Sequence, residues 1–296
     1  MSIATLLLPD FTLILLGFWL YRTTHWGAAF WTGLEKLVYY VLFPALLFYA
    51  TSRTVLDFAT TGKLLQVALT TVSIGIALGW LAKPLFKAGP MMFESGVQTA
   101  FRFNSYIGLA LASRLAGDQG TSLMALIIGF AVPVCNAAAV HALVHKSGGL
   151  VRELVRNPLL LATVAGVLFN LTGLALPEVL GATLTRLGNA SVALGLISVG
   201  AGLQLSGMQA PKGLSTYFLG VKLLALPAIA FGLGTWIGLP SLQLQIAVMF
   251  CALPTASSAY VLAARMGGNG PFVAFLISVG TLVSIVTLPL WLLAVR

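Results

Sequence analysis

Long apolar segments separated by short polar connections repeat along the whole chain. About ten of them are long enough to cross the ~30 Å hydrocarbon core of a membrane as helices. The segments are 3–22, 34–52, 64–82, 92–115, 121–143, 158–176, 187–205, 214–237, 242–264 and 271–294. This pattern predicts an all-α integral membrane protein with ten transmembrane helices, in which residues 1–296 form a single membrane domain.

Two of these segments, the fourth and the ninth, contain matching polar interruptions. The interruptions are Arg-Phe-Asn-Ser-Tyr-Ile-Gly at 102–108 and Leu-Pro-Thr-Ala-Ser-Ser-Ala at 253–259. Each is followed by an arginine, Arg114 or Arg265, and then by a glycine-rich turn. Aligning the two arginines places Asn104 opposite Thr255. Polar, helix-breaking residues at corresponding places in two halves of a chain are typical of the binding site of a secondary transporter.

The number of segments in each half indicates how the halves are arranged. Five helices per half make the second half enter the membrane from the opposite side, because five is odd. We therefore expect two inverted five-helix repeats, 1–144 and 158–296, joined by the basic cytoplasmic loop 145–157. If helices four and nine, each broken by its polar interruption, cross in this arrangement, two half-helix N-termini meet near the middle of the membrane.

Local chemistry explains why the interruptions suit a bound anion. Pro254 has no N–H and should break the ninth helix, after which Thr255 can cap a new half-helix. The N-terminus of each half-helix carries about half a positive charge, so two of them offset about one carboxylate. The candidate substrate-binding residues are Asn104, Ser105, Pro254, Thr255, Ser257 and Ser258. A structural role stays open for Ser257 and Ser258, because serine in membrane helices often bonds to its own backbone.

Charged and amide side chains inside the segments are further candidates for the transport pathway or for coupling. Asp10 lies early in the first segment. Glu94, Gln98 and Arg102 have i, i+4 spacing, which places them on one face of the fourth helix. This stripe either lines the pathway or forms an ion pair at the membrane interface. Arg102 is also the nearest positive charge that could offset the second charge of a dianion.

Composition and charge exclude several classes of protein. With 59% hydrophobic and 8% charged residues, a chain of 296 residues could not solvate the surface of a soluble domain. The net charge of +9 comes from basic residues scattered between the segments, so we expect no nucleic-acid partner. Lys and Arg are more frequent in the odd-numbered connections than in the even-numbered ones. The positive-inside rule then predicts a multi-pass protein of the cytoplasmic membrane with both termini outside.

Motifs of enzymes and metal sites do not occur in the sequence. It contains no Gly-x-Ser-x-Gly, no His-Glu-x-x-His and no aspartate cluster for a diphosphate–metal site. His141 and His145 have i, i+4 spacing but no carboxylate or cysteine nearby, so we expect no metal site. Cys135 and Cys251 fall inside predicted helices and are expected to be buried apolar residues. We expect neither enzymatic activity nor a cofactor.

With their flanking residues, the two interruptions resemble motifs of the auxin efflux carrier family, which includes plant auxin carriers and bacterial malonate- or malate-permease-like members. Arg-Phe-Asn-Ser-Tyr-Ile-Gly-Leu-Ala (102–110) resembles the motif of the fourth span. Ala-Leu-Pro-Thr-Ala-Ser-Ser-Ala-Tyr-Val-Leu-Ala (252–263) resembles that of the ninth. Val132-Pro133 with Asn136 in the fifth segment also fits, and the short central loop is similar to that of the bacterial members.

The resemblance implies ten spans as inverted repeats and an elevator-like motion of a transport domain against a scaffold, whose helices would form a homodimer. It implies a small organic anion whose carboxylate binds where the broken helices cross. Asn104 matches the fourth-span asparagine of the family, and Pro254 matches the ninth-span proline. Asn136 joins the candidates for the pathway or for coupling. Ser258 stands where many members have an asparagine, which weakens the expected amide contact on that side.

We therefore expect a secondary active or facilitative transporter of a small carboxylate, with the lipid bilayer as its surroundings. A coupling ion could be H⁺ on Asp10 or Glu94, or Na⁺ held by backbone carbonyls at the interruptions. Uncoupled efflux is also open, because a negative interior favours anion exit by ~2.3 kcal/mol per charge per 100 mV. The alternative is a channel or a ligand sensor on the same fold, without concentrative transport.

Overall fold

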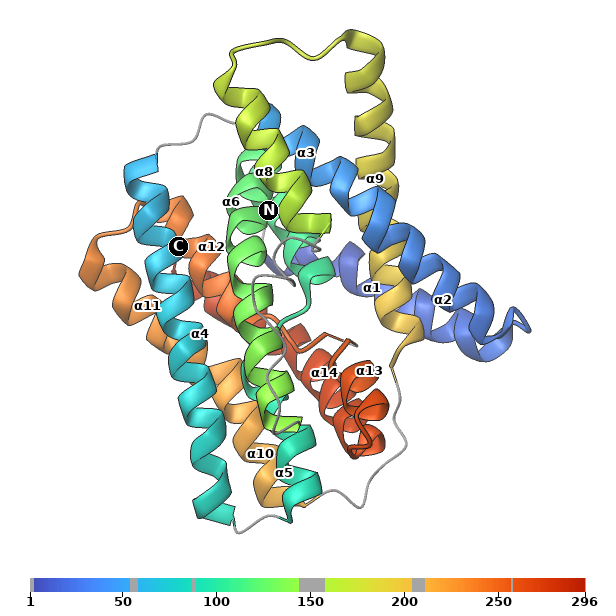
Figure 1. The fold of residues 1–296 in the computed structure, drawn as a ribbon, viewed down its shortest axis with the longest axis vertical. Coiled ribbons are helices and arrows are strands. Elements are labelled where there is room, and N and C mark those ends of the chain that lie inside the picture. Colours follow the sequence, from blue (N-terminus) through green and yellow to red (C-terminus); the bar gives the residue numbers. More distant parts are fainter. Residues whose placement is uncertain are drawn as a thin grey trace. The chain divides into compact units, whose positions relative to one another are not determined.

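The computed structural model describes residues 3–53, 58–86, 89–143, 158–203, 211–256 and 258–295, and every regular element in these ranges is helical (Figure 1). The helices form two compact units. Unit 1 comprises Met1–Thr61, Ser105–Phe130 and Val151–Gly202, and unit 2 comprises Gly62–Asn104, Ala131–Leu150 and Leu203–Arg296. Each unit therefore draws its helices from both halves of the sequence.

Long apolar helices make up most of the described residues. Within these residues, six helical stretches are long and apolar enough to cross a membrane. They are Gly27–Arg53, Thr61–Phe86, Pro90–Leu143, Glu178–Ala201, Lys212–Ile237 and Gly270–Ala294. Shorter apolar helices cover Phe11–Thr23, Leu161–Leu171 and Ser241–Ala252. The prediction of an all-α membrane protein is confirmed for the described part of the chain.

The stretch Pro90–Leu143 has 54 residues, far more than the ~20 that one crossing needs. It consists of α5 (Pro90–Gly96), the 3₁₀-helix η2 (Val97–Ala100), the irregular residues 101–104 and α6 (Ser105–Leu143). Helix α6 is kinked at Gly117, whose φ of 53° is a left-handed conformation that glycine adopts without steric cost. The kink falls between the fourth and fifth apolar segments predicted from the sequence.

Unit 1 is built on three close pairings of helices. Helix α1 packs against α9, and α3 packs against both α8 and α9 (Figure 1). Glycines permit this proximity, since a Cβ atom on Gly200 would overlap the carbonyl oxygen of Ile14 and one on Gly166 would crowd Phe48. The helices of unit 1 are α1 (Ile3–Thr23), α2 (Gly27–Leu37), the π-turn η1 (Val38–Leu42), α3 (Phe43–Arg53), the first part of α6, α8 (Pro158–Leu171) and α9 (Glu178–Ala201).

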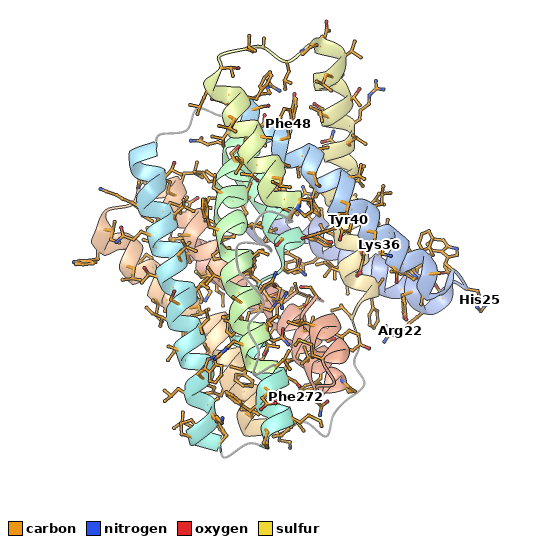
Figure 2. All side chains as sticks on the ribbon, viewed as in Figure 1. Arg22, His25, Lys36, Tyr40, Phe48 and Phe272 are labelled. Atoms are coloured by element: carbon orange, nitrogen blue, oxygen red, sulfur yellow. The ribbon has the colours of Figure 1, made fainter. Side chains whose placement is uncertain are left out.

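Aromatic and basic side chains gather at the turn that joins α1 to α2. The ring centroids of Trp26 and Trp31 lie 5.8 Å apart, and the Arg22 guanidinium carbon lies 3.6 Å from the centroid of the Phe18 ring. Figure 2 shows the Arg22 and His25 side chains at this turn. Amphipathic aromatic and basic side chains of this kind are typical of the membrane–water interface.

Unit 2 contains residues 102–104 of the first polar interruption and all of the second. In Figure 1 its C-terminal helices α13 and α14 lie together, in red, and they are in contact. Unit 2 contains α5, η2 and the second part of α6, which is residues 131–143. Its other helices are α4 (Phe58–Phe86, from Gly62 onward), α10 (Lys212–Gly220), the π-turn η3 (Val221–Ala225), α11 (Leu226–Ile237), α12 (Ser241–Ala252), α13 (Ser258–Arg265) and α14 (Gly270–Ala294).

A proline accounts for the π-turn η3. Pro227 has no N–H, and its ring crowds the carbonyl of Leu223, one turn earlier. The Leu226 N–H bonds instead to the Val221 carbonyl oxygen, five residues back. The indole N–H of Trp291, on α14, donates to the Leu223 carbonyl oxygen at 2.9 Å. The Trp291 indole thus supplies a donor to the carbonyl that faces the proline ring.

Replacing Gly200 by alanine tests the contact between α1 and α9. We expect Gly200→Ala to lower the melting temperature of the detergent-purified protein by several degrees, because the added methyl group would overlap the Ile14 carbonyl oxygen. Gly33→Ala is the matched control. It has open space around it on α2, so it should stabilise the helix by about 0.5–1 kcal/mol. Equal melting temperatures for Gly200→Ala and wild type would contradict the close approach.

Candidate functional site

The first interruption separates η2 from α6. Helix α5 ends at Gly96 and the tighter η2 ends at Ala100, after which the chain is irregular until α6 begins at Ser105. The Gln98 carbonyl oxygen accepts the backbone N–H of Arg102 at 2.9 Å, which closes the end of the helix. Arg102 and Asn104 therefore lie in a short linker between two half-helices.

The second interruption separates α12 from α13. Helix α12 ends at Ala252, and Leu253 is extended, with φ −60° and ψ 139°. The residue before a proline is sterically excluded from the α region, so Pro254 ends the helix at the predicted place. Residues 253–256 are not helical, and α13 begins at Ser258. The sequence pattern and the backbone agree on where the ninth segment breaks.

The two interruptions meet within unit 2. The backbone N–H of Asn104 donates to the Pro254 carbonyl oxygen at 2.8 Å. The Thr255 hydroxyl donates to the Thr99 carbonyl oxygen, also at 2.8 Å. These bonds supply partners to backbone groups that leave the helices and would otherwise face apolar surroundings. The structure therefore brings together Asn104, Pro254 and Thr255, three residues singled out from the sequence.

Arg102 links three elements around this meeting point. Its guanidinium donates to Gln98 Oε1 on η2 at 3.1 Å, to Asn136 Oδ1 on α6 at 2.8 Å and to Ser258 Oγ on α13 at 3.2 Å. The side chain is only 9% exposed. A planar group with five donors can serve several acceptors at once. A buried positive charge of the first interruption is thus bonded to Ser258 of the second.

The acidic candidate Glu94 lies further back, on α5, where it is half-buried. The amide nitrogen of Gln98 donates to the Ser95 carbonyl oxygen at 3.1 Å, while its oxygen accepts from Arg102. Because η2 is a 3₁₀-helix, the i, i+4 alignment of an α-helix does not extend unchanged from Glu94 to Arg102. Contacts join Gln98 to Arg102, and no such contact places Glu94 beside them within the described residues.

The other predicted site residues differ in burial and in position. Asn104 and Thr255 are buried in unit 2, whereas Ser258 is exposed. Asn136, on the second part of α6, is half-buried. Ser105 is the first residue of α6, is half-buried and belongs to unit 1.

Three of the candidate side chains lie outside the described residues. They are those of Ser257, of Asp10, and of His145 within the loop 145–157. His141 is described, and its ring centroid lies 5.7 Å from that of Trp80. In the ranges that the structure covers, no group of three or more His, Cys, Asp and Glu side chains could hold a metal ion.

One buried charge in unit 2 was not singled out by the sequence patterns. Lys222, in η3, is 3% exposed, and its Nζ donates to the Cys251 carbonyl oxygen at 3.0 Å. The signal was available, because a lysine in the middle of the predicted helix 214–237 is an ionisable residue at membrane depth. Glu35, half-buried within the predicted helix 34–52, carries the same signal in unit 1. Counting every charge inside the predicted helices would have found both.

Comparison with known proteins identifies relatives over almost the whole chain. A protein of Methanothermobacter thermautotrophicus described as "Uncharacterized transporter" is 27% identical over 286 residues, covering 94% of each chain. A protein of Rhizobium meliloti described as "Putative malonate transporter" is 27% identical over 300 residues, covering 97% of this chain and 93% of the relative.

The family comparison is more direct. Residues 138–292, just over half of the chain, match the family described as membrane transport protein, to which the auxin efflux carriers belong. This match includes the second interruption, and the first interruption carries the motif that resembles the fourth span of the same family. The chain therefore belongs to the membrane transport protein (auxin efflux carrier) family, and it is a multi-pass membrane transporter and not an enzyme.

Proposed function

We propose that the protein is a secondary carrier that moves a small carboxylate across the cytoplasmic membrane and holds it where the two interruptions meet. The observation that carries the proposal is Arg102. Its buried guanidinium bonds to side chains of η2, α6 and α13 beside the Asn104–Pro254 backbone hydrogen bond. A charged donor fixed by several elements is suited to orienting a planar carboxylate.

Charge balance supports a dicarboxylate. The N-terminus of α13 contributes about half a positive charge, and Arg102 adds one full charge. The sum of about one and a half exceeds the charge of one carboxylate and favours a dianion such as malonate. The name of the Rhizobium meliloti relative assigns malonate to that protein, which supports the same class of substrate here.

Hydrogen-bond chemistry divides the candidates into two roles. A carboxylate only accepts hydrogen bonds, so its partners must donate. The hydroxyl proton of Thr255 is directed to the Thr99 carbonyl, and we therefore assign Thr255 to holding the interruptions together. The Asn104 amide and the hydroxyls of Ser105, Ser257 and Ser258 are the proposed donors to the ligand. Pro254 contributes by ending α12 and by accepting from the Asn104 N–H.

The packing of unit 1 supports the inverted-repeat architecture. In a five-plus-five arrangement, α1 and α3 lie in spans one and two, and α8 and α9 lie in spans six and seven. Span one packs on span seven and span two packs on span six, so the pairing is reciprocal. A two-fold relation between repeats 1–144 and 158–296 requires this reciprocity. Ten spans, with the loop 145–157 in the cytoplasm and both termini outside, complete the proposed topology.

The division into two units supports an elevator-like mechanism. Residues 62–104 and 203–296, which contain both interruptions apart from Ser105 onward, belong to unit 2. A ligand held by Arg102, Asn104 and Ser258 would therefore travel with one body. Unit 1 would provide the scaffold, and its helices are the proposed homodimer contact. Three driving forces are compatible with this mechanism. They are coupling to H⁺ at Glu94 or Asp10, coupling to Na⁺, and uncoupled efflux down the membrane potential.

Removing the amide of Asn104 tests the location of the site. In proteoliposomes, wild-type protein should carry a saturable current on addition of malonate. The current carried by Asn104→Ala should be at least about 10-fold smaller, because a hydrogen bond to a charged acceptor contributes about 1.5–3 kcal/mol to the free energy of binding. Gln119→Ala, which removes an exposed amide, is the control and should behave as wild type.

The form of the flux separates the competing functions. Current that does not saturate with malonate concentration would favour a channel, and tight binding without flux would favour a ligand sensor. Equal currents in wild type and Asn104→Ala would place the site elsewhere in the protein.

The charge of Arg102 should matter more for a dianion than for a monoanion. We expect Arg102→Gln to raise the KM for malonate roughly 10- to 100-fold while changing the KM for acetate far less. Arg102→Lys keeps the charge but loses the planar guanidinium, so its KM for malonate should lie between those of wild type and Arg102→Gln. Arg186→Gln removes an exposed charge from α9 and serves as the control. An equal increase in KM for both acids would show that Arg102 maintains the structure of the site and does not discriminate between a dianion and a monoanion.

A further inference from the structure

Lys222 places a charge in the interior of a transmembrane segment. It lies in the middle of the apolar stretch Lys212–Ile237 and is 3% exposed. An ammonium group is expensive to keep at membrane depth, so such residues have a fixed partner or a function. The partner of Lys222 is the Cys251 carbonyl oxygen, 3.0 Å from its Nζ.

The position of Cys251 gives this contact its meaning. Cys251 is the next-to-last residue of α12, and Thr255, four residues on, is outside the helix. The Cys251 carbonyl therefore lacks the helical N–H that it would have in an unbroken span. The C-terminus of a helix also carries about half a negative charge. Lys222 supplies both the missing donor and the compensating positive charge.

Two nearby carbonyls, those of Phe250 and Pro254, have backbone donors instead. The Phe250 carbonyl oxygen accepts from the Leu253 N–H at 3.3 Å, and the Pro254 carbonyl oxygen accepts from the Asn104 N–H at 2.8 Å. The Cys251 carbonyl is thus the place at the end of α12 where a cation is built in.

The backbone around Lys222 is fixed from two sides. The π-turn η3 sets its register through the bond from the Leu226 N–H to the Val221 carbonyl oxygen. The Trp291 indole ties the adjacent Leu223 carbonyl to α14. Lys222 is therefore held on a packed element of unit 2, the same unit that contains Cys251.

Carriers with broken helices commonly coordinate Na⁺ with unwound carbonyls and the C-terminal ends of half-helices. We propose that the Lys222 ammonium is a tethered cation that occupies this position, so that the protein needs no free Na⁺ to complete the end of α12. This assigns Lys222 as a positioning residue that determines ion dependence. Only the transport arm of its test rests on the proposed carboxylate function.

The first arm of the test measures melting temperature in detergent, at constant ionic strength, in choline, sodium or methylammonium chloride. Wild type should melt at the same temperature in all three salts. Lys222→Ala vacates the ammonium position, so Na⁺ or methylammonium should raise its melting temperature by about 5 °C over choline. Lys222→Met refills the space without a charge and should show no difference between salts. Lys212→Ala, at the exposed start of α10, is the control and should match wild type.

Three outcomes of this arm would overturn the proposal. A sodium-stabilised wild type would reveal a free cation site beside Lys222. A Lys222→Ala variant that is indifferent to salt would show that no cation position exists there. A Lys222→Met variant that responds as strongly as Lys222→Ala would show that the salts act elsewhere.

The second arm measures malonate current in proteoliposomes with Na⁺ or choline on both sides. Wild type should carry equal current in either salt, and Lys222→Met should lose the current in both. These two proteins decide the proposal even if Lys222→Ala does not fold. A sodium-dependent wild-type current would overturn the tethered cation while leaving the carrier function intact. Absence of any malonate current, together with the expected melting pattern, would overturn the proposed substrate and leave the tethered cation standing.

Discussion

Backbone groups at membrane depth must find partners inside the protein, because lipid offers none. Both polar interruptions break their helices and expose such groups, and each interruption satisfies the other. The Asn104 N–H bonds to the Pro254 carbonyl, and the Thr255 hydroxyl bonds to the Thr99 carbonyl. Either break alone would leave unpaired groups at a cost of several kcal/mol. The rest of unit 2 depends on this mutual pairing, because it fixes the ends of α12 and α13 and the linker before α6.

Two buried cations complete the same region in different ways. Arg102 is joined to polar side chains near the start of α13, where a positive helix end and an arginine together favour an anion. Lys222 is joined to a backbone carbonyl near the end of α12, where the helix end is negative. In our proposals the first charge attracts the substrate and the second replaces a coupling ion. The two roles follow from which end of a half-helix each cation meets.

Much of the helical framework could be predicted from the sequence, since apolar length and proline are local signals. The break at Pro254 was placed correctly, because a proline acts on its own helical turn and on the residue before it. The kink at Gly117 falls in the predicted connection for a similar reason. Lys222 lies outside both interruptions and so was not predicted, although an ionisable residue within an apolar helix is itself a local signal. The 3₁₀ geometry of η2 was not predictable from spacing, and it alters the face that Glu94, Gln98 and Arg102 were expected to share.

The sequence by itself determined the class of the protein, the positions of its breaks and the residues with chemistry to offer, because each of these depends on composition or on a few adjacent residues. Only the tertiary structure decided which of those residues meet. Arg102 lies 156 residues from Ser258 along the chain, yet their side chains are hydrogen-bonded. The Thr255 hydroxyl bonds to the Thr99 carbonyl, and on this contact we base the proposal that Thr255 holds the interruptions together. Such pairings depend on how distant helices pack, and no local pattern encodes that.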